Sequence, residues 1–416
     1  MARRKIAFTL YQHHQCRGPQ NLILEQLREL GVDISEGQVN PYIIPGQSGQ
    51  ALYWRSLVTR RNIVVRGLVH FVWIPCNHIL VDDKESFHSE QSQVLQAGLE
   101  IADYIHVDDT GARHQGQNGF CTVIGNDLFT HFSSTNSKSR ENYLRILLGP
   151  HKDFVLNEYS RSYLEMQQLA ACHLSKLQFS SAVISNGDTS WQKYLEALGI
   201  TSQQGIKLVT EAALLGSAIE HGLSPEMIIL SDGARQFAIG IHALCWVHME
   251  RSIRRLNGVT AQQRQEIEEV LDALWVYYRQ LKAYQQQPTL QERERLSHRF
   301  DEIFGQRYPY HYGLNLAMQQ FCAHKQELLR VLDAPHVPLH TNAAEADIRE
   351  YVTRRKISGG TRHDNGRRVR DTFTGLKKTC RKLAFSFWQY LMSRLRGDGS
   401  VPYLPNVIRA QAMAKT

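Results

Sequence analysis

The sequence lacks any hydrophobic run long enough to cross a membrane. Its most apolar stretch, residues 62–76, is interrupted by Arg66 and His70 and is shorter than the roughly 20 residues that a spanning helix needs. The apolar run at residues 6–10 is followed at once by polar residues, which does not fit a secretory signal. We therefore expect a soluble protein of the cytoplasm with no membrane partner.

Cysteine is sparse and is not grouped. The 416 residues contain seven cysteines, scattered along the chain. An odd number in a chain of this length argues against a disulfide framework and for reduced thiols. Net charge is also modest, at +8 with 21% charged residues. A basic excess of this size fits a polyanionic partner, but a plain basic surface would look the same.

Acidic residues are absent from residues 41–77, and this segment interrupts a helical pattern. Residues 19–40 read as a helix–turn–helix, with Gly31 ending one helix and Ser35 and Gln38 forming a capping box for the next. An ordinary helical hairpin would show the same pattern. We interpret residues 1–40 as a helical, DNA-binding-like segment and residues 41–77 as an atypical insertion, after which helical periodicity resumes.

The period then changes from helical to extended. Short strands are predicted at 104–110, 119–125 and 128–133, and a helix at 137–148. This β-β-β-α order is how a ribonuclease-H-like core begins. We therefore predict an α/β fold, with a mixed sheet flanked by helices. The expected parts are a first core segment at 78–257 with a helical insertion at 151–223, an α-helical insertion at 258–340, and a closing core segment at 341–416.

Within these parts, further elements are expected. A strand-like run at 179–184 stands among the helices of the first insertion. Another strand is predicted at 227–231. A helix that includes residues 242–248 should follow Gly233.

Three acidic residues have contexts that suggest a metal site. Asp108 and Asp232 each follow a short β-favouring run, and Glu345 lies in an Ala-rich stretch that reads as helix. Open sheets present ligand groups at strand ends, and hard oxygen ligands suit magnesium or manganese better than zinc. Taken singly, each acid also fits a turn residue or a helix cap. Together, they could hold two cations at a phosphodiester.

The segments around these acids resemble the IS66-type DDE transposases. The matching phrases are His106–Thr110, Leu230–Phe237, Cys245–His248, Asn342–Glu345, Arg354–Arg362 and Thr372–Cys380. The resemblance covers roughly residues 100–395. It implies an RNase H-like core in which Asp108, Asp232 and Glu345 are the catalytic acids and hold two Mg²⁺ ions, with Mn²⁺ as an alternative. Asp109 stands where the family often has Glu, and we treat it as a neighbour of the ligand Asp108.

The implied activity is metal-dependent DNA cleavage at the ends of an insertion sequence, followed by strand transfer into target DNA. The implied partners are double-stranded DNA, further copies of the chain assembled on it, and accessory proteins. The implied location is the bacterial cytoplasm, at the nucleoid when the protein acts. No covalent protein–DNA intermediate is needed. Two alternatives stay open: an inactive, DNA-binding transposase remnant, and a standalone RNase H-like nuclease.

Residues 349–382 hold twelve Lys or Arg against three acids. A solvated helix face is the usual explanation of such a run. Here the basic run follows Glu345, which the resemblance implies is catalytic. It also contains a Gly pair whose backbone amides could approach phosphates. We predict sequence-independent contact with the DNA backbone, and assign recognition of the element ends to the N-terminal helices. The candidate DNA-binding residues are Arg354, Arg355, Lys356, Arg362 and Arg367.

Cys245 and His248 form a Cys-x-x-His pair just after Asp232. No second pair lies at a usual spacing, so a zinc site would be incomplete. The pair could pack in the helix after the second acid, clip a metal, or orient a ligand beside Asp232. Packing is the simplest of the three.

Overall fold

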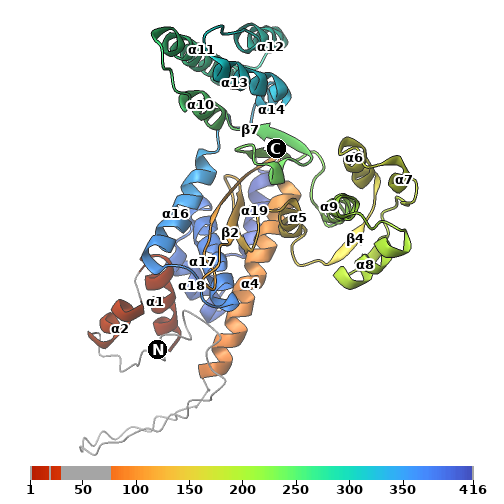
Figure 1. Cartoon of the computed structure of the whole chain (residues 1–416). Coiled ribbons are helices and arrows are strands. Elements are labelled where there is room, and N and C mark those ends of the chain that lie inside the picture. The colour runs from red at the N-terminus through yellow and green to blue at the C-terminus, as the bar shows by residue number, and fades with distance from the viewer. Residues whose placement is uncertain (1, 18–19, 30–75, 415–416) are drawn as a thin grey trace, which may run out of the picture.

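The computed structural model describes residues 2–17, 20–29 and 76–414 (Figure 1). The N-terminal part contains α1 (Ala2–His14) and α2 (Gln20–Glu29). The second half of the expected helix–turn–helix lies outside the described residues, as does the expected insertion up to residue 75. None of the described helices combines the length and the apolar character that a membrane crossing requires. The six cysteines whose side chains are described form no disulfide.

A five-stranded mixed sheet lies at the centre. Its strands are β1 (Tyr104–Gly111), β2 (Phe120–Gly125), β3 (Thr130–Thr135), β6 (Ile228–Ser231) and β7 (Ile241–Leu244). They lie in the order β3-β2-β1-β6-β7. The first three strands are antiparallel, whereas β6 is parallel to β1 and β7 is parallel to β6. The predicted α/β class, with a mixed sheet flanked by helices, is confirmed.

Strand β7 corrects a sequence-based prediction. A helix was expected over residues 242–248, but the first half of this range pairs with β6, with Leu244 opposite Ser231. Helix α10 (Trp246–Arg254) begins only after Cys245. A short apolar run is ambiguous between helix and strand. Here the free edge of β6 decides it, because the run satisfies its backbone hydrogen bonds in the sheet.

Helices cover both faces of the sheet (Figure 1). Those of the core are α4 (Cys76–Ile101), α5 (Arg140–Leu148), α16 (Asn342–Ser358), α17 (Asp364–Lys382), α18 (Phe387–Arg396) and α19 (Leu404–Met413). Ile105 and Val107 of β1 are buried in the main core with residues of α4 and α5. On the opposite face, Val123 of β2 packs with Ala344 of α16. Because Val123 is the cross-strand partner of Asp108, the Asp108 side chain lies on the face that α16 covers.

The first insertion, at residues 151–223, is mostly helical as expected, but it contains two strands where one was predicted. Its helices are α6 (Glu158–Met166), α7 (Ala171–Leu174), α8 (Asp188–Ala197) and α9 (Gln203–Glu220). It also contains a two-stranded antiparallel sheet of β4 (Asp153–Val155) and β5 (Val183–Asn186). The expected strand at 179–184 is thus displaced toward higher residue numbers, and β4 is too short for a strand pattern to show.

The second insertion is helical, as predicted, within the part of the chain that the structure describes. Its helices are α11 (Ala261–Gln286), α12 (Leu290–Phe304), α13 (Tyr312–Ala323), α14 (Lys325–Leu328) and α15 (Arg330–Asp333). Trp246, the first residue of α10, is buried among their aromatic side chains. Its indole Nε1 donates to the carbonyl oxygen of Leu328 at 2.9 Å. The insertion is therefore anchored directly beside the carboxyl end of β7.

Candidate active site

Asp108 and Asp232 lie side by side at the carboxyl edge of the paired part of β1 and β6, beyond which β1 itself continues to Gly111. The parallel register of β1 and β6 pairs His106 with Leu230, and each acid follows two residues later. This edge is where open α/β sheets present functional groups. Asp232 follows the last residue of β6, and its Oδ1 accepts from the backbone N–H of Ala234 at 2.9 Å in the turn beyond the strand.

The environment of Asp108 disfavours its charged form. Burial raises its pKa to about 6, the backbone N–H of Asp109 opposes this shift, and the negative charges of Asp232 and Asp109 add to it. That N–H donates to Asp108 Oδ1 at 2.7 Å. A bound cation would offset the burial and the neighbouring negative charge that raise the pKa of Asp108.

Glu345 lies in the first turn of α16, on the helix that covers the face carrying Asp108. Its Oε1 is 3.1 Å from a guanidinium nitrogen of Arg251 and 3.6 Å from His248 Nε2. The charges of Asp108 and Asp232 also interact with His248. His248 therefore lies among all three acids, and the structure brings them to one region.

The three carboxyl groups are nevertheless not packed tightly. Among the described residues, they do not form a set of ligand atoms within 4.8 Å of one another. Arg251 and His248 both contact Oε1 of Glu345. A metal that joined all three acids would have to draw Glu345 away from Arg251.

Asp109 differs from Asp108 in its partners. It forms an ion pair with Lys138, and the Gln236 amide donates to its Oδ2 at 2.7 Å. Since neighbouring residues of a strand point to opposite faces, Asp109 is directed away from α16. This arrangement fits Asp109 as a neighbour of the site and leaves Asp108 as the ligand candidate.

Cys245 connects the end of β7 to the start of α16. Its backbone N–H donates to the Ser231 oxygen at 2.9 Å, and its buried sulfur accepts from the backbone N–H of Thr341 at 3.3 Å. Thr341 immediately precedes α16, and its carbonyl oxygen accepts from the Glu345 N–H at 2.9 Å. The sulfur therefore helps to fix the first turn of the helix that carries Glu345.

Cys245 and His248 also influence each other's ionisation. The pKa of His248 is raised, first by the Cys245 thiol, against the opposing effects of burial and of the Arg251 charge. Burial would raise the pKa of Cys245, but His248 and Thr341 bring it below its ordinary value. These contacts place the pair between the end of β7, the start of α16 and the acids.

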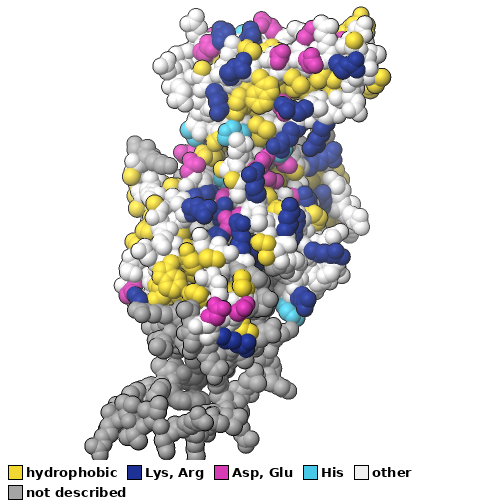
Figure 2. Space-filling view, turned by 90° about the vertical axis from the view of Figure 1, so that its left-hand side faces the viewer, with side chains coloured by type: hydrophobic (Ala, Val, Ile, Leu, Met, Phe, Trp, Pro, Cys, Tyr) yellow, Lys and Arg dark blue, Asp and Glu magenta, His cyan; other side chains and the backbone are white. Residues whose placement is uncertain are grey.

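The predicted DNA-binding residues divide into exposed and buried ones. Figure 2 shows Lys and Arg side chains gathered over the middle of the face that carries α16. Lys356 and Arg362 are exposed, and Arg355 is partly exposed. Arg367 is partly buried, where it donates to Asn136 at 2.8 Å and to Asp364 at 3.0 Å.

Arg354 does not fit the DNA-contact prediction, which we correct. Its side chain is 6% exposed, and it donates to His14 Nδ1 at 2.8 Å and to Thr374 at 3.4 Å. Burial lowers its pKa to about 9. Arg354 thus joins α16 to α1 and α17, because it lies on the inner side of α16.

Comparisons with known proteins agree with the resemblance in the sequence. A family model described as "Transposase IS66 family" matches residues 233–369. The uncharacterized protein y4jO of Sinorhizobium fredii (strain NBRC 101917 / NGR234) is 41% identical over 322 residues, which span 77% of this chain and 100% of that protein. The chain belongs to the IS66 transposase family. No solved structure matches it.

Membership of the IS66 transposase family implies DNA as the substrate. The matched segment begins directly after Asp232 and contains Glu345, the Cys245–His248 pair and most of the basic run. Arg251, which touches Glu345, also lies in it, although it was not singled out from the sequence. Its position one helical turn after His248 was the available signal, since residues three apart share a helix face.

Proposed function

We propose that this chain is a DDE transposase, which cuts DNA at the ends of an insertion sequence and joins the freed ends to target DNA. One observation carries the proposal. Asp108 of β1 and Asp232, which follows β6, lie at the same level beside the parallel pairing of these strands, and α16 brings Glu345 to the same region. Family membership supplies the nature of the substrate.

The sheet supports an RNase H-like core. Three consecutive antiparallel strands are followed by a helix, and the chain then returns to add β6 parallel to β1. This is the order that the sequence predicts for such a core. It places Asp108 beside Asp232 although 124 positions separate them in the chain.

Asp108, Asp232 and Glu345 would hold the Mg²⁺ ions, with Mn²⁺ as an alternative. The raised pKa of Asp108 fits this role, because burial and neighbouring negative charge are what a bound cation offsets. When bound, the ions supply Lewis-acid stabilisation of the attacking and leaving oxygens of the phosphodiester.

The other residues of the site position these acids. Cys245 fixes the start of α16, and His248 and Arg251 hold the Glu345 carboxylate. Arg355, Lys356, Arg362 and Arg367 supply positive charge for the DNA backbone. We further propose that the chain acts in the bacterial cytoplasm as an assembly of several copies on paired DNA ends, with accessory proteins.

The test is cleavage and strand transfer by the full chain on a supercoiled plasmid that carries the terminal repeats of its element, in Mg²⁺. We expect Asp232→Asn and Glu345→Gln to abolish both reactions. Asp103→Asn is the matched control, since Asp103 is exposed and precedes the opposite end of β1. This variant should keep the parent activity.

Other outcomes would favour the alternatives. Binding of the element ends without any cleavage by the parent chain would support an inactive remnant. Cleavage of arbitrary branched or hybrid substrates would support a standalone nuclease. Cleavage that survives both Asp232→Asn and Glu345→Gln would contradict the assignment of these acids.

A further inference from the structure

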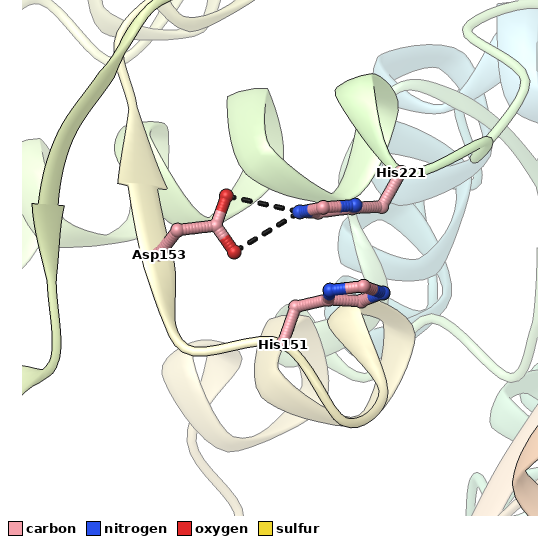
Figure 3. A group of neighbouring side chains, drawn as sticks. All are labelled: His151, Asp153 and His221. Carbon is pink, nitrogen blue, oxygen red and sulfur yellow. Dashed lines mark hydrogen bonds and ion pairs between the residues drawn. The ribbon is translucent and has the colours of Figure 1, made fainter.

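A second group of metal-ligating side chains lies in the first insertion, away from α16 (Figure 1). His151 precedes β4, Asp153 begins β4, and His221 directly follows α9. Figure 3 shows the three side chains close together, with the Asp153 carboxylate directed at the His221 ring and the His151 ring stacked against that ring. One ligand atom from each lies within 4.8 Å of the others, and no other group of three or more such residues meets this limit among the described residues.

We propose that His151, Asp153 and His221 form a binding site for one divalent metal ion, and that this ion is Zn²⁺. Two imidazole nitrogens and one carboxylate oxygen are a donor set that zinc accepts in proteins, with the fourth position left to water. Imidazole also selects against magnesium and calcium, which prefer oxygen ligands. The site is thus distinct in chemistry from the three acids at the sheet edge, and it does not depend on the proposed function.

The surrounding residues orient the ligands. Asp153 is buried, with 8% of the residue exposed. Its Oδ2 accepts a hydrogen bond from the Ser217 hydroxyl at 2.7 Å. The Gln96 amide on α4 lies 3.3 Å from His151 Nε2. The amide nitrogen donates to Nε2, so the neutral ring carries its proton on Nδ1. His151 would bind a metal through Nδ1 once the amide turns its oxygen toward Nε2, which can then carry the proton. Partners of this kind fix the tautomer and direction of metal ligands.

The arrangement also allows a metal to enter. His221 Nε2 lies 3.0 Å from both oxygens of Asp153, and its side chain is 32% exposed. The rings of His151 and His221 are stacked, with centroids 3.5 Å apart and an interplanar angle of 11°. Parallel rings do not aim their lone pairs at one point, so His221, the more exposed ring, must turn out of the stack on binding.

A metal held here would connect two elements of the insertion. Asp153 lies on β4 and His221 directly follows α9, and Gln96 of α4 contacts His151. The metal would therefore tie β4 and α9 together where the insertion joins α4.

The experiment uses the untagged full chain carrying Asp232→Asn and Glu345→Gln, so that the sheet-edge acids do not compete for metal. Chelator-treated protein is titrated with Co²⁺, followed by its visible absorption, and Zn²⁺ is then added to displace it. We expect about one equivalent of Co²⁺ per chain. Zn²⁺ should also raise the melting temperature of this protein.

Variants of the ligands decide the outcome. His151→Ala and His221→Ala should each weaken Zn²⁺ binding by more than the 10–100-fold that loss of an outer partner causes, and Ser217→Ala by about that amount. His298→Ala, which removes an exposed histidine of α12, is the control and should bind as before. Each variant is checked for native circular dichroism. Unchanged Zn²⁺ affinity in folded His151→Ala and His221→Ala chains, or no Co²⁺ bound by the background protein, would overturn the proposal.

Discussion

The Asp347 carboxylate on α16 lies 3.7 Å from His106 Nε2 on β1. Asp347 follows Glu345 by two residues, and His106 precedes Asp108 by two. The same carboxylate receives hydrogen bonds from Thr130 on β3 and Lys382 on α17, both at 2.9 Å. A buried polar contact therefore holds the helix of the third acid against the strand of the first.

Asp347→Asn should destabilise the chain. Only 4% of the residue is exposed, and its carboxylate forms ion pairs with the ammonium groups of Lys378 and Lys382. Breaking a buried ion pair by removing one partner costs about 3–5 kcal/mol. We expect a fall of this order in the free energy of unfolding in urea, together with loss of cleavage. Asp188→Asn, whose carboxylate is largely exposed, should change stability little, and equal stability of the two variants would contradict the prediction.

The pH dependence of this contribution follows from the same contacts. Burial alone would raise the pKa of Asp347, but its interaction with His106 and the charges of Lys382 and Lys378 place it well below the ordinary value. The stabilisation is therefore complete above the unfolded pKa, near 4, and is lost as the pH falls toward the folded value. The stability difference between the parent and Asp347→Asn should shrink in acid.

Asp108 should show the opposite dependence. The pKa of Asp108 in the folded chain is about 6, above its unfolded value near 4. Between these two pH values the folded chain binds more protons than the unfolded chain, so its stability falls as the pH rises from about 4 to about 6. Asp108→Asn removes this effect. In metal-free buffer it should gain stability relative to the parent from about pH 4 to pH 6, by at most about 3 kcal/mol, and keep that gain above pH 6.

Urea unfolding at several pH values measures this difference, with Asp103→Asn as the control. Mg²⁺ should then stabilise the parent at neutral pH but not Asp108→Asn, because only the parent presents the carboxylate. A stability difference that does not vary with pH would rule out the raised pKa.

Local patterns predicted the elements that carry the first two acids. Tyr104–Gly111 begins with a short β-favouring run and is followed by a turn, so β1 and the place of Asp108 in it could be predicted without the fold. Asp232 follows an apolar run that β6 confirms. Periodicity could not predict that Asp108 and Asp232 are neighbours, because only the parallel pairing of β1 with β6 brings them together. Family resemblance, not periodicity, suggested it.

Tertiary contacts decide two features that local sequence patterns do not predict, namely strand β7 and the direction of the Arg354 side chain. Ile241–Leu244 is too short for its period to separate strand from helix, and the free edge of β6 settled it. Arg354 is charged and stands in a basic run, yet α16 turns it toward His14 of α1. Charge in a sequence predicts exposure only when the face of the helix is known.

Cys245 should act through the position of Glu345. Cys245→Ala removes the acceptor of the Thr341 N–H, whereas Cys245→Ser keeps an acceptor atom. A displacement of about 1 Å in a reacting group can lower a rate on the order of 100-fold. We expect Cys245→Ala to lower the cleavage rate by about 10–100-fold with unchanged DNA affinity, and Cys245→Ser to lower it less. Single-turnover cleavage and DNA titration measure the two quantities, and exposed Cys172→Ser is the control.

Arg362 and Arg354 form a matched pair for testing the basic run. Arg362→Ala removes an exposed charge, so DNA affinity should fall for all sequences and the slope of log affinity against log salt should decrease by about 0.9. Its stability should stay within about 0.5 kcal/mol of the parent. Arg354→Ala instead removes a buried guanidinium that donates to His14 and should cost about 1.5–3 kcal/mol of unfolding free energy. Its salt slope should match that of the parent where the chain is folded, since a buried guanidinium releases no counterion from DNA. A reduced salt slope for folded Arg354→Ala would return this residue to the DNA surface.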